Sequence, residues 1–269
     1  MRSSARFRKE EKSDGERTQL GVCREVLAER RWLSQCGTMK PIEDLGVEAV
    51  RSLAGVAFDI DDTVTRGGRL ELMAFKAMHE LAESGLRLIA VTGRPLGWVD
   101  VVAQHWPVDV AVGENGAGWV WMDGRTPREG YYESEERRSE NAELFERVRR
   151  RVRQELPHVR TSMDQRARRC DLAFDIGEMV QLPREDVEAL VSIIEGEGAR
   201  CAVSSVHAHA VPGDWNKARG IKRAVLEALG VDIEAEEDRW LFIGDSPNDA
   251  SAFRYFPISV GVSELTPGS

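Results

Sequence analysis

Short apolar runs alternate with amphipathic segments along the first half of this chain of 269 residues. Three of the runs have the length of β-strands: residues 55–60, 86–91 and 108–112. Two of the segments repeat apolar residues at helical spacing: residues 70–84 and 96–104. Strands that alternate with helices on short connections form a parallel sheet that is covered on both faces. The sequence therefore predicts an α/β protein with a Rossmann-like parallel sheet.

A long segment of different character interrupts this alternation. It holds helical patterns at residues 143–156 and 183–196, and extended stretches at residues 159–176 and 201–211 with an antiparallel character. The first pattern then resumes, with helices predicted at 217–229 and 248–255 and strands at 239–244 and 258–262. We therefore expect an α+β cap domain inserted into a core domain. The predicted boundaries are 1–50 for an N-terminal extension, 51–123 and 213–269 for the core, and 124–212 for the cap.

Carboxylates cluster where the first predicted strand ends, in Asp59-Ile60-Asp61-Asp62-Thr63. Two like charges that are held close together raise each other's pKa unless a cation or a proton relieves them. Asp59 and Asp61 therefore indicate a divalent metal, a shared proton, or both. The alternative is a capping and turn cluster before a helix, because Asp and Thr are common in such positions.

Three further polar elements belong with this cluster. They are Thr92-Gly93-Arg94 after the second strand, Lys217 at the start of a helix, and Gly244-Asp245-Ser246-Pro247-Asn248-Asp249 after a late strand. Ligands of parallel sheets bind beyond the carboxyl ends of the strands, so these elements can meet there. Carboxylates, a hydroxyl and an ammonium group suit phosphoryl transfer. Taken alone, Lys217 is also explained as a solvated lysine in the first turn of a helix. Lys222 is a possible substitute for it as the ammonium group of the site.

In order and kind, the four elements resemble the motifs of the haloacid dehalogenase (HAD) superfamily of phosphatases. The resemblance implies that Asp59 is the nucleophile, which forms an aspartyl-phosphate. It implies that Asp61 is the general acid toward the leaving alcohol and then the base for water. Thr92 and the backbone N–H of Gly93 would hold the transferred phosphate, and Lys217 would bridge that phosphate and Asp59.

The same resemblance implies a Mg²⁺ cofactor. Its ligands would be Asp59, the backbone carbonyl of Asp61 and Asp245, with Asp249 and Asn248 completing or orienting the shell. Oxygen ligands of this kind are what Mg²⁺ requires. The chain departs from the family where a Lys-Gly pair is usual, because Ala218 follows Lys217 and the glycine is displaced to Gly220.

The position of the cap resembles subclass IIB of that superfamily. The insert lies between the Thr92 and Lys217 elements, and the chain carries Thr92-Gly93-Arg94-Pro95 and Glu114-Asn115-Gly116-Ala117. The subclass contains sugar-phosphate phosphatases and phosphomannomutase. The resemblance therefore implies a Mg²⁺-dependent phosphatase for a small phosphorylated metabolite, with a sugar phosphate favoured. A phosphomutase and a catalytically silent scaffold that acts as a binding protein are the alternatives.

Candidate substrate-binding residues lie in both predicted domains: Gly93, Arg94, Asn115, His207 and Trp215. His207 and His209 alternate with apolar residues, so they share one strand face. Three interpretations of the two histidines are open: polar residues on an exposed face of the sheet, contacts to the substrate, or ligands of a metal ion. Trp215 lies beside Lys217 and could stack on a sugar, although core packing is the alternative. The other polar candidates of the cap are Asp164, Gln165, Arg166, Arg168, Arg169, Ser204 and Ser205.

Composition excludes several classes of partner. The net charge of −9 argues against nucleic acid. No stretch approaches the roughly 18 apolar residues of a membrane span. The four cysteines are scattered, which predicts neither a zinc site nor disulfides and favours a cytoplasmic location. Residues 1–38 are expected to be mostly disordered or loosely attached, with a basic interaction arm as the alternative. The sequence does not indicate an oligomeric state.

Overall fold

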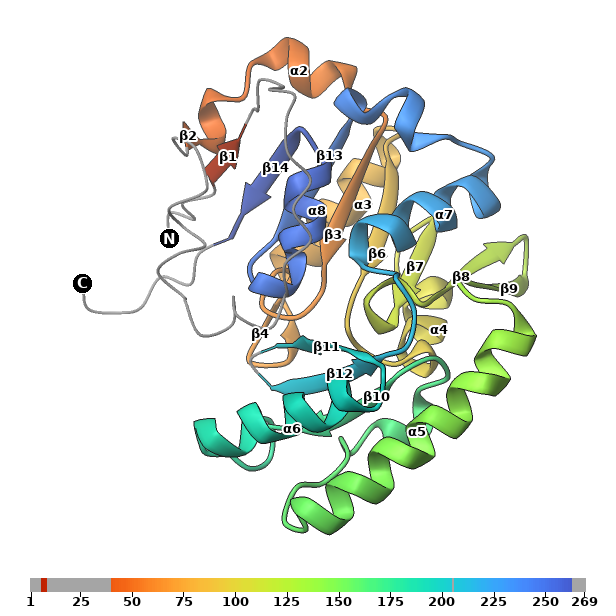
Figure 1. Ribbon diagram of the computed structural model, residues 1–269. Coiled ribbons are helices and arrows are strands. Elements are labelled where there is room, and N and C mark those ends of the chain that lie inside the picture. The colour runs from red at the N-terminus through yellow and green to blue at the C-terminus, as the bar shows by residue number, and fades with distance from the viewer. Residues whose placement is uncertain (1–5, 9–39, 205, 263–269) are drawn as a thin grey trace, which may run out of the picture.

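The computed structural model describes residues 6–8, 40–204 and 206–262. A core domain carries a large central sheet, and a smaller cap lies across the carboxyl ends of its parallel strands (Figure 1). No helix in the described ranges is both long and apolar enough to cross a membrane.

The central sheet has nine strands in the order β2-β1-β14-β13-β3-β6-β7-β8-β9. Its parallel part consists of β14 (Ile258–Gly261), β13 (Trp240–Gly244), β3 (Gly55–Asp59), β6 (Arg87–Val91) and β7 (Val110–Gly113). Antiparallel strands extend both edges: β1 (Arg6–Arg8), β2 (Lys40–Pro41), β8 (Gly118–Asp123) and β9 (Thr126–Tyr131). The predicted parallel α/β core is therefore confirmed.

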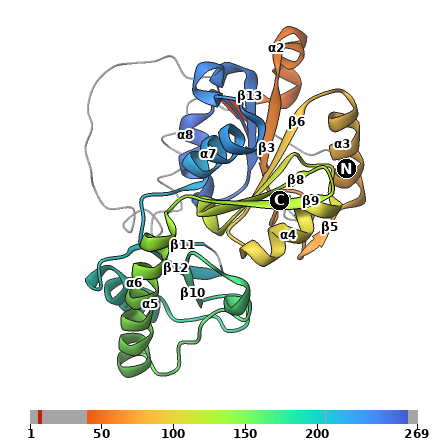
Figure 2. The same ribbon diagram turned by 90° about the vertical axis from the view of Figure 1, so that its right-hand side faces the viewer.

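Helices cover both faces of this sheet (Figure 2). They are α3 (Leu72–Glu83) and α4 (Leu96–His105) on one face, and α7 (Lys217–Leu229) and α8 (Ala250–Tyr255) on the other. In β3, Val56 and Phe58 pack toward α3 and α4, whereas Ala57 packs toward α7. Both strand faces are thus buried, which explains why β3 and β6 are continuous apolar runs.

Short elements complete the core. They are the helix α2 (Val47–Ser52), the hairpin strands β4 (Thr65–Arg66) and β5 (Arg69–Leu70), and the 3-10 turns η2 (Ile42–Asp44), η3 (Glu114–Gly116), η5 (Ile233–Ala235), η6 (Glu237–Arg239) and η7 (Pro247–Asp249).

The cap packs two helices on one face of a small antiparallel sheet. Its elements are α5 (Glu135–Glu155), the turn η4 (Gln165–Ala167), β10 (Leu172–Asp175), α6 (Arg184–Gly196), β11 (Arg200–Val203) and β12 (His207–Val211), with strand order β10-β12-β11. Ala208 and Ala210 pack under the helices, whereas Val211 belongs to the hydrophobic cluster of the core domain. The helix-free face of the cap sheet therefore faces the core.

Several predicted boundaries are wrong. Strand β9 pairs with β8 along its length, so the core sheet continues to Tyr131 and the cap does not begin at residue 124. The stretch 201–211 is two antiparallel strands rather than one. Helix α5 begins at Glu135, eight residues before the predicted start, because Ser134 caps it by accepting a hydrogen bond from the backbone N–H of Arg137.

The N-terminal extension is ordered wherever the structure describes it. Strand β1 pairs with β14, and residues 40–52 form β2, η2 and α2. The expectation of a loosely attached tail is therefore wrong for residues 6–8. The other residues of the 1–38 segment lie outside the described part.

Candidate active site

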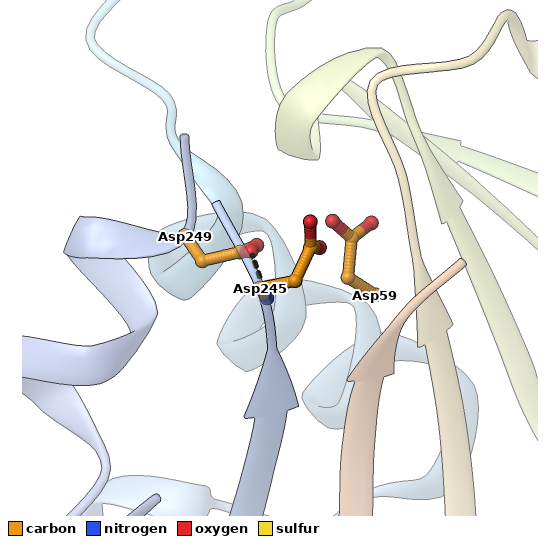
Figure 3. Close-up of side chains that lie close together, drawn as sticks. All are labelled: Asp59, Asp245 and Asp249. Carbon is orange, nitrogen blue, oxygen red and sulfur yellow. Dashed lines mark hydrogen bonds between the residues drawn. The ribbon is translucent and has the colours of Figure 1, made fainter. Parts of the chain in front are cut away.

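Three carboxylates meet at the carboxyl edge of the central sheet (Figure 3). Asp59 ends β3, Asp245 directly follows the neighbouring strand β13, and Asp249 ends the turn η7. One carboxylate oxygen of each lies within 4.8 Å of the other two. Asp59 and Asp249 are buried, and Asp245 is half-buried. The predicted meeting of the strand-end acids is thus found, and such an oxygen cluster has the donors that Mg²⁺ requires.

Lys217 supplies one buried ammonium group to this cluster. Its Nζ lies 2.8 Å from Oδ2 of Asp59 and 2.7 Å from Oδ1 of Asp249. Burial alone would lower the pKa of Lys217, but the two carboxylates raise it above the ordinary value. Helix α7 begins at Lys217, since the side chain of Asn216 caps it. Lys222 pairs with Glu234 instead, so it does not substitute for Lys217.

The cluster holds more negative than positive charge. Burial raises the pKa of Asp59 well above its ordinary value, and the Asp249 carboxylate raises it further although Lys217 opposes this. Burial and the Asp249 charge raise the pKa of Asp245 to about 6. Three carboxylates beside one ammonium group would be relieved by a divalent cation. The donor set therefore fits the predicted Mg²⁺ ion.

The side chain of Asp249 holds the loop after β13 in its conformation. Its Oδ2 atom accepts hydrogen bonds of 3.1 Å from the backbone N–H groups of Asp245 and Ser246. A Cβ atom on Gly244 would lie 2.6 Å from that oxygen, so only glycine leaves room for the carboxylate. Asp245 also accepts a 2.9 Å hydrogen bond from the Thr63 hydroxyl, which connects the loop to the turn after β3.

Asp61 faces Arg94 rather than the carboxylate cluster. Its oxygens accept hydrogen bonds of 3.1–3.2 Å from Nε and Nη2 of Arg94 and one of 3.3 Å from the Thr92 hydroxyl. Burial lowers the pKa of Arg94, but the hydrogen bonds and charges of Asp61 and Glu178 together raise it above its ordinary value. The side chain expected to act as the general acid is therefore held by two residues of the loop after β6.

The loop after β7 places a polar atom beside Gly93. Asn115 adopts a left-handed conformation with φ of +55°. Its buried Oδ1 atom has no hydrogen-bond partner among the described residues, and lies 3.2 Å from the position of a Cβ atom on Gly93. A buried polar atom without a partner is costly, which is consistent with a ligand at this point.

The comparisons with known proteins concern the fold. No protein-family model and no curated protein matches the sequence. Solved structures do match: sucrose-phosphatase from Synechocystis, in complex with sucrose and phosphate, has 15% identity and a TM-score of 0.57 over 80% of this chain and 85% of that one. The fold of this chain is the HAD fold.

Other proteins with the HAD fold match over similar lengths. The C-terminal domain of trehalose-6-phosphate phosphatase from C. albicans has 12% identity and a TM-score of 0.57, over 78% of this chain and 76% of that one. IMP-bound IMP-nucleotidase from Plasmodium falciparum has 12% identity and a TM-score of 0.55, over 90% of this chain and 75% of that one.

The displaced glycine of α7 has a structural reason within this HAD fold. A Cβ atom on Gly220 would lie 2.3 Å from the Cα atom of Gly116, so the first turn of α7 packs directly against the backbone of η3. Close approach of two backbones requires glycine at both positions. Gly220 therefore helps to place Lys217 beside Asp59.

The two histidines of β12 are buried, so the interpretation that they are polar residues on an exposed face of the sheet is wrong. His207 Nε2 lies 2.9 Å from Oε2 of Glu178, and His209 Nδ1 lies 2.8 Å from Oδ2 of Asp171. Both side chains point from the helix-free face of the cap sheet toward the core. Burial, and then the neighbouring His209, lower the pKa of His207.

Trp215 is only 1% exposed and packs near Tyr132, with ring centroids 6.2 Å apart. A side chain without an accessible face cannot stack on a substrate, so the core-packing alternative holds in this structure. Among the cap candidates, Ser205 lies outside the described residues.

Two acids at the junction of core and cap were not assigned roles from the sequence. Glu114 is buried and accepts hydrogen bonds from the backbone N–H groups of residues 96, 169, 170 and 171. Glu178 accepts a 2.9 Å hydrogen bond from Nη1 of Arg94 and thereby connects the cap to the residue that holds Asp61. The only sequence signal for Glu178 is its position just after a predicted extended segment that ends in Asp175-Ile176.

Proposed function

We propose that the protein is a Mg²⁺-dependent phosphatase that hydrolyses a small phosphorylated metabolite. The observation that carries the proposal is the buried group of Asp59, Asp245 and Asp249 with Lys217 at the carboxyl edge of a HAD-fold sheet. The acids would hold the ion together with the backbone carbonyl of Asp61. Bound there, Mg²⁺ would offset the repulsion between an anionic nucleophile and an anionic phosphate.

The reaction proceeds in two displacements. A carboxylate oxygen of Asp59 forms a bond to phosphorus, the ester P–O bond breaks, and the leaving alkoxide takes a proton from Asp61. Water then attacks phosphorus, gives a proton to Asp61, and frees Asp59 as phosphate leaves. Lys217 stabilises charge on the phosphate and on Asp59 throughout. Thr92 and the backbone N–H of Gly93 would hold the phosphate oxygens, and Asn115 lies beside Gly93.

The substrate is expected to be a small phosphate ester. The names of the similar structures refer to sucrose phosphate, trehalose 6-phosphate and IMP, which supports this size class. A sugar phosphate and a cytoplasmic location remain predictions from the sequence. A phosphomutase would use the same Asp59 and Asp61, and interconversion of sugar phosphate isomers without net release of phosphate would favour that alternative.

The test is phosphate release by Asp59→Asn from a panel of phosphate monoesters. An amide is a poor nucleophile, so we expect a loss of about 10³-fold or more. Asp62→Asn is the matched control, because Asp62 lies three residues further along the same loop, is exposed and has φ of +55°, which Asn tolerates. Equal activity of Asp59→Asn and wild type would refute the proposal, as would full activity in excess EDTA.

A further inference from the structure

A groove of ≈490 Å³ lies between the start of α4 and two cap loops. Trp98 of α4 forms one side of it, and Met163 and Met179 of the cap contribute to the other. Arg94 lines the same groove and also holds Asp61. A volume of this order suits a small organic ligand.

The groove exposes large apolar side chains. Trp98 is 51% exposed, Met163 71% and Met179 64%. Single exposed apolar residues are ordinary, but three around one concave surface next to a candidate active site indicate a binding surface. Tryptophan and methionine are also well suited to contact a flat ring, through stacking and through sulfur–aromatic contacts.

The acidic groups of the groove are already engaged within the protein. Glu178 accepts from Arg94 through Oε1, and its Oε2 lies 2.9 Å from Nε2 of His207. Both oxygens of Asp164 accept hydrogen bonds from Arg168, at 3.1 and 3.2 Å. Each oxygen already accepts one hydrogen bond, so these carboxylates are weaker acceptors for the hydroxyl groups of a sugar than free carboxylates would be. The surface that remains for a ligand is mainly apolar.

The groove lies next to Asp61, because Arg94 lines the groove and also binds Asp61. Asp61 is the proposed donor of a proton to the leaving-group oxygen, so that oxygen must lie beside Asp61. Arg94 contacts Asp61 at one end of its guanidinium group and Glu178 at the other, and it lies over the ring of Trp98 with 5.0 Å to the centroid. The atoms beyond the leaving-group oxygen therefore extend past Arg94 into the groove.

We propose that this groove binds the alcohol part of the substrate, and that this alcohol carries an aromatic or heteroaromatic ring rather than an unsubstituted sugar. The proposal rests on the proposed phosphatase function. Trp98 stacks on the ring, and Met163 and Met179 close over its other side. Arg166, an exposed cation in the lining of the groove, attracts the anionic ester.

The test compares three esters of primary alcohols: benzyl phosphate, cyclohexylmethyl phosphate and glucose 6-phosphate. Each has the same CH₂–O–P linkage, so differences in kcat/KM report mainly on the group bound in the groove. We expect benzyl phosphate to exceed glucose 6-phosphate by about tenfold or more, with cyclohexylmethyl phosphate between them. Trp98→Ala should lower the ratio of benzyl to glucose 6-phosphate kcat/KM about tenfold.

Val101→Ala is the matched control, because Val101 lies on the same helix, is 56% exposed and does not line the groove. It should leave the ratio unchanged. A preference for glucose 6-phosphate over both other esters, or an unchanged ratio in Trp98→Ala, would overturn the groove proposal while leaving the phosphatase function intact.

A separate measurement covers the case in which no ester, nor acetyl phosphate, is hydrolysed. That result would count against the phosphatase function itself. Binding of benzylphosphonate in the presence of Mg²⁺ would then be measured by calorimetry. Binding to the wild type that is weakened about tenfold or more in Trp98→Ala would still support the groove, and equal or absent binding would overturn it.

Discussion

The carboxylate of Glu114, in the core, accepts a 3.0 Å hydrogen bond from the backbone N–H of Asp171, in the cap. The same carboxylate accepts bonds from the N–H groups of Arg169 and Cys170, at 2.9 and 2.6 Å. The side chain of Asp171 in turn binds His209 of the cap sheet. One buried core carboxylate therefore fixes a cap segment, and the position of the cap over the site depends on it.

Replacing Glu114 should change how stability depends on pH. Burial and the Asp171 charge raise the pKa of Glu114 from 4.5 to about 7, although the backbone N–H groups oppose this. Between these values the folded protein holds a proton that the unfolded chain has lost, so this group's contribution to stability falls as pH rises from about 4.5 to 7. Glu114→Gln lacks the titration.

Urea unfolding at pH 5 and pH 8 measures this difference. The wild type should lose stability relative to Glu114→Gln over that interval. The variant is still less stable at pH 5, because its NH₂ group places donors against backbone N–H groups that an oxygen of Glu114 accepts from. Glu80→Gln, on the exposed face of α3, should follow the wild type. Parallel pH profiles of wild type and Glu114→Gln would contradict the expectation.

Lys217→Met should destabilise the protein strongly. It leaves the buried carboxylates of Asp59 and Asp249 without their shared cation, at an expected cost of about 3–5 kcal/mol at neutral pH. Lys222→Met is the control, since Lys222 pairs with the exposed Glu234 and should cost about 1 kcal/mol or less. Adding Asp249→Asn to Lys217→Met should recover part of the loss. Similar losses in the two single variants, measured by urea unfolding, would contradict this account.

The core and its carboxylate cluster could be predicted because each depends on local patterns. Each buried strand is a continuous apolar run that ends in a polar residue, and parallel strands bring their carboxyl ends to one edge. Asp59, Asp245, Asp249 and Lys217 meet for that reason. Strand β9 escaped prediction because it lies at the edge of the sheet and four of its six residues are exposed, so it has no apolar run.

The junction of the two domains could not be predicted in the same way. Glu114 and Cys170 are 56 residues apart, and nothing in either segment encodes their contact. The burial of His207 and Trp215 likewise depends on how the cap sheet faces the core. Periodicity shows which residues share a face, but not which domain later covers that face.

Mg²⁺ should stabilise the folded protein in the absence of substrate. An ion bound by Asp59, Asp245 and Asp249 offsets their mutual repulsion, and at a concentration a hundredfold above its Kd it should raise Tm by about 5–10 °C. Asp245→Asn should remove most of this shift, while its own Tm without the ion should be unchanged or higher, because one repelling charge is gone. Differential scanning fluorimetry with NaCl of equal ionic strength separates binding from screening. A shift of equal size in Asp245→Asn would show that the ion binds elsewhere.

Gly220→Ala tests whether the close approach of α7 to η3 positions the lysine. The new Cβ atom would lie 2.3 Å from Cα and 2.7 Å from the carbonyl oxygen of Gly116, and neither backbone can yield without moving its element. We expect a loss of about 2–3 kcal/mol or more, together with reduced turnover, because α7 also carries Lys217. At Gly196 the new Cβ atom would meet only the flexible Nη1 of Arg151, at 3.0 Å, so Gly196→Ala should be neutral or stabilising by up to about 1 kcal/mol. Urea unfolding and turnover are measured on both variants. If α7 can shift outward without cost, Gly220→Ala will be as stable and as active as Gly196→Ala, and that result would contradict the positioning role of Gly220.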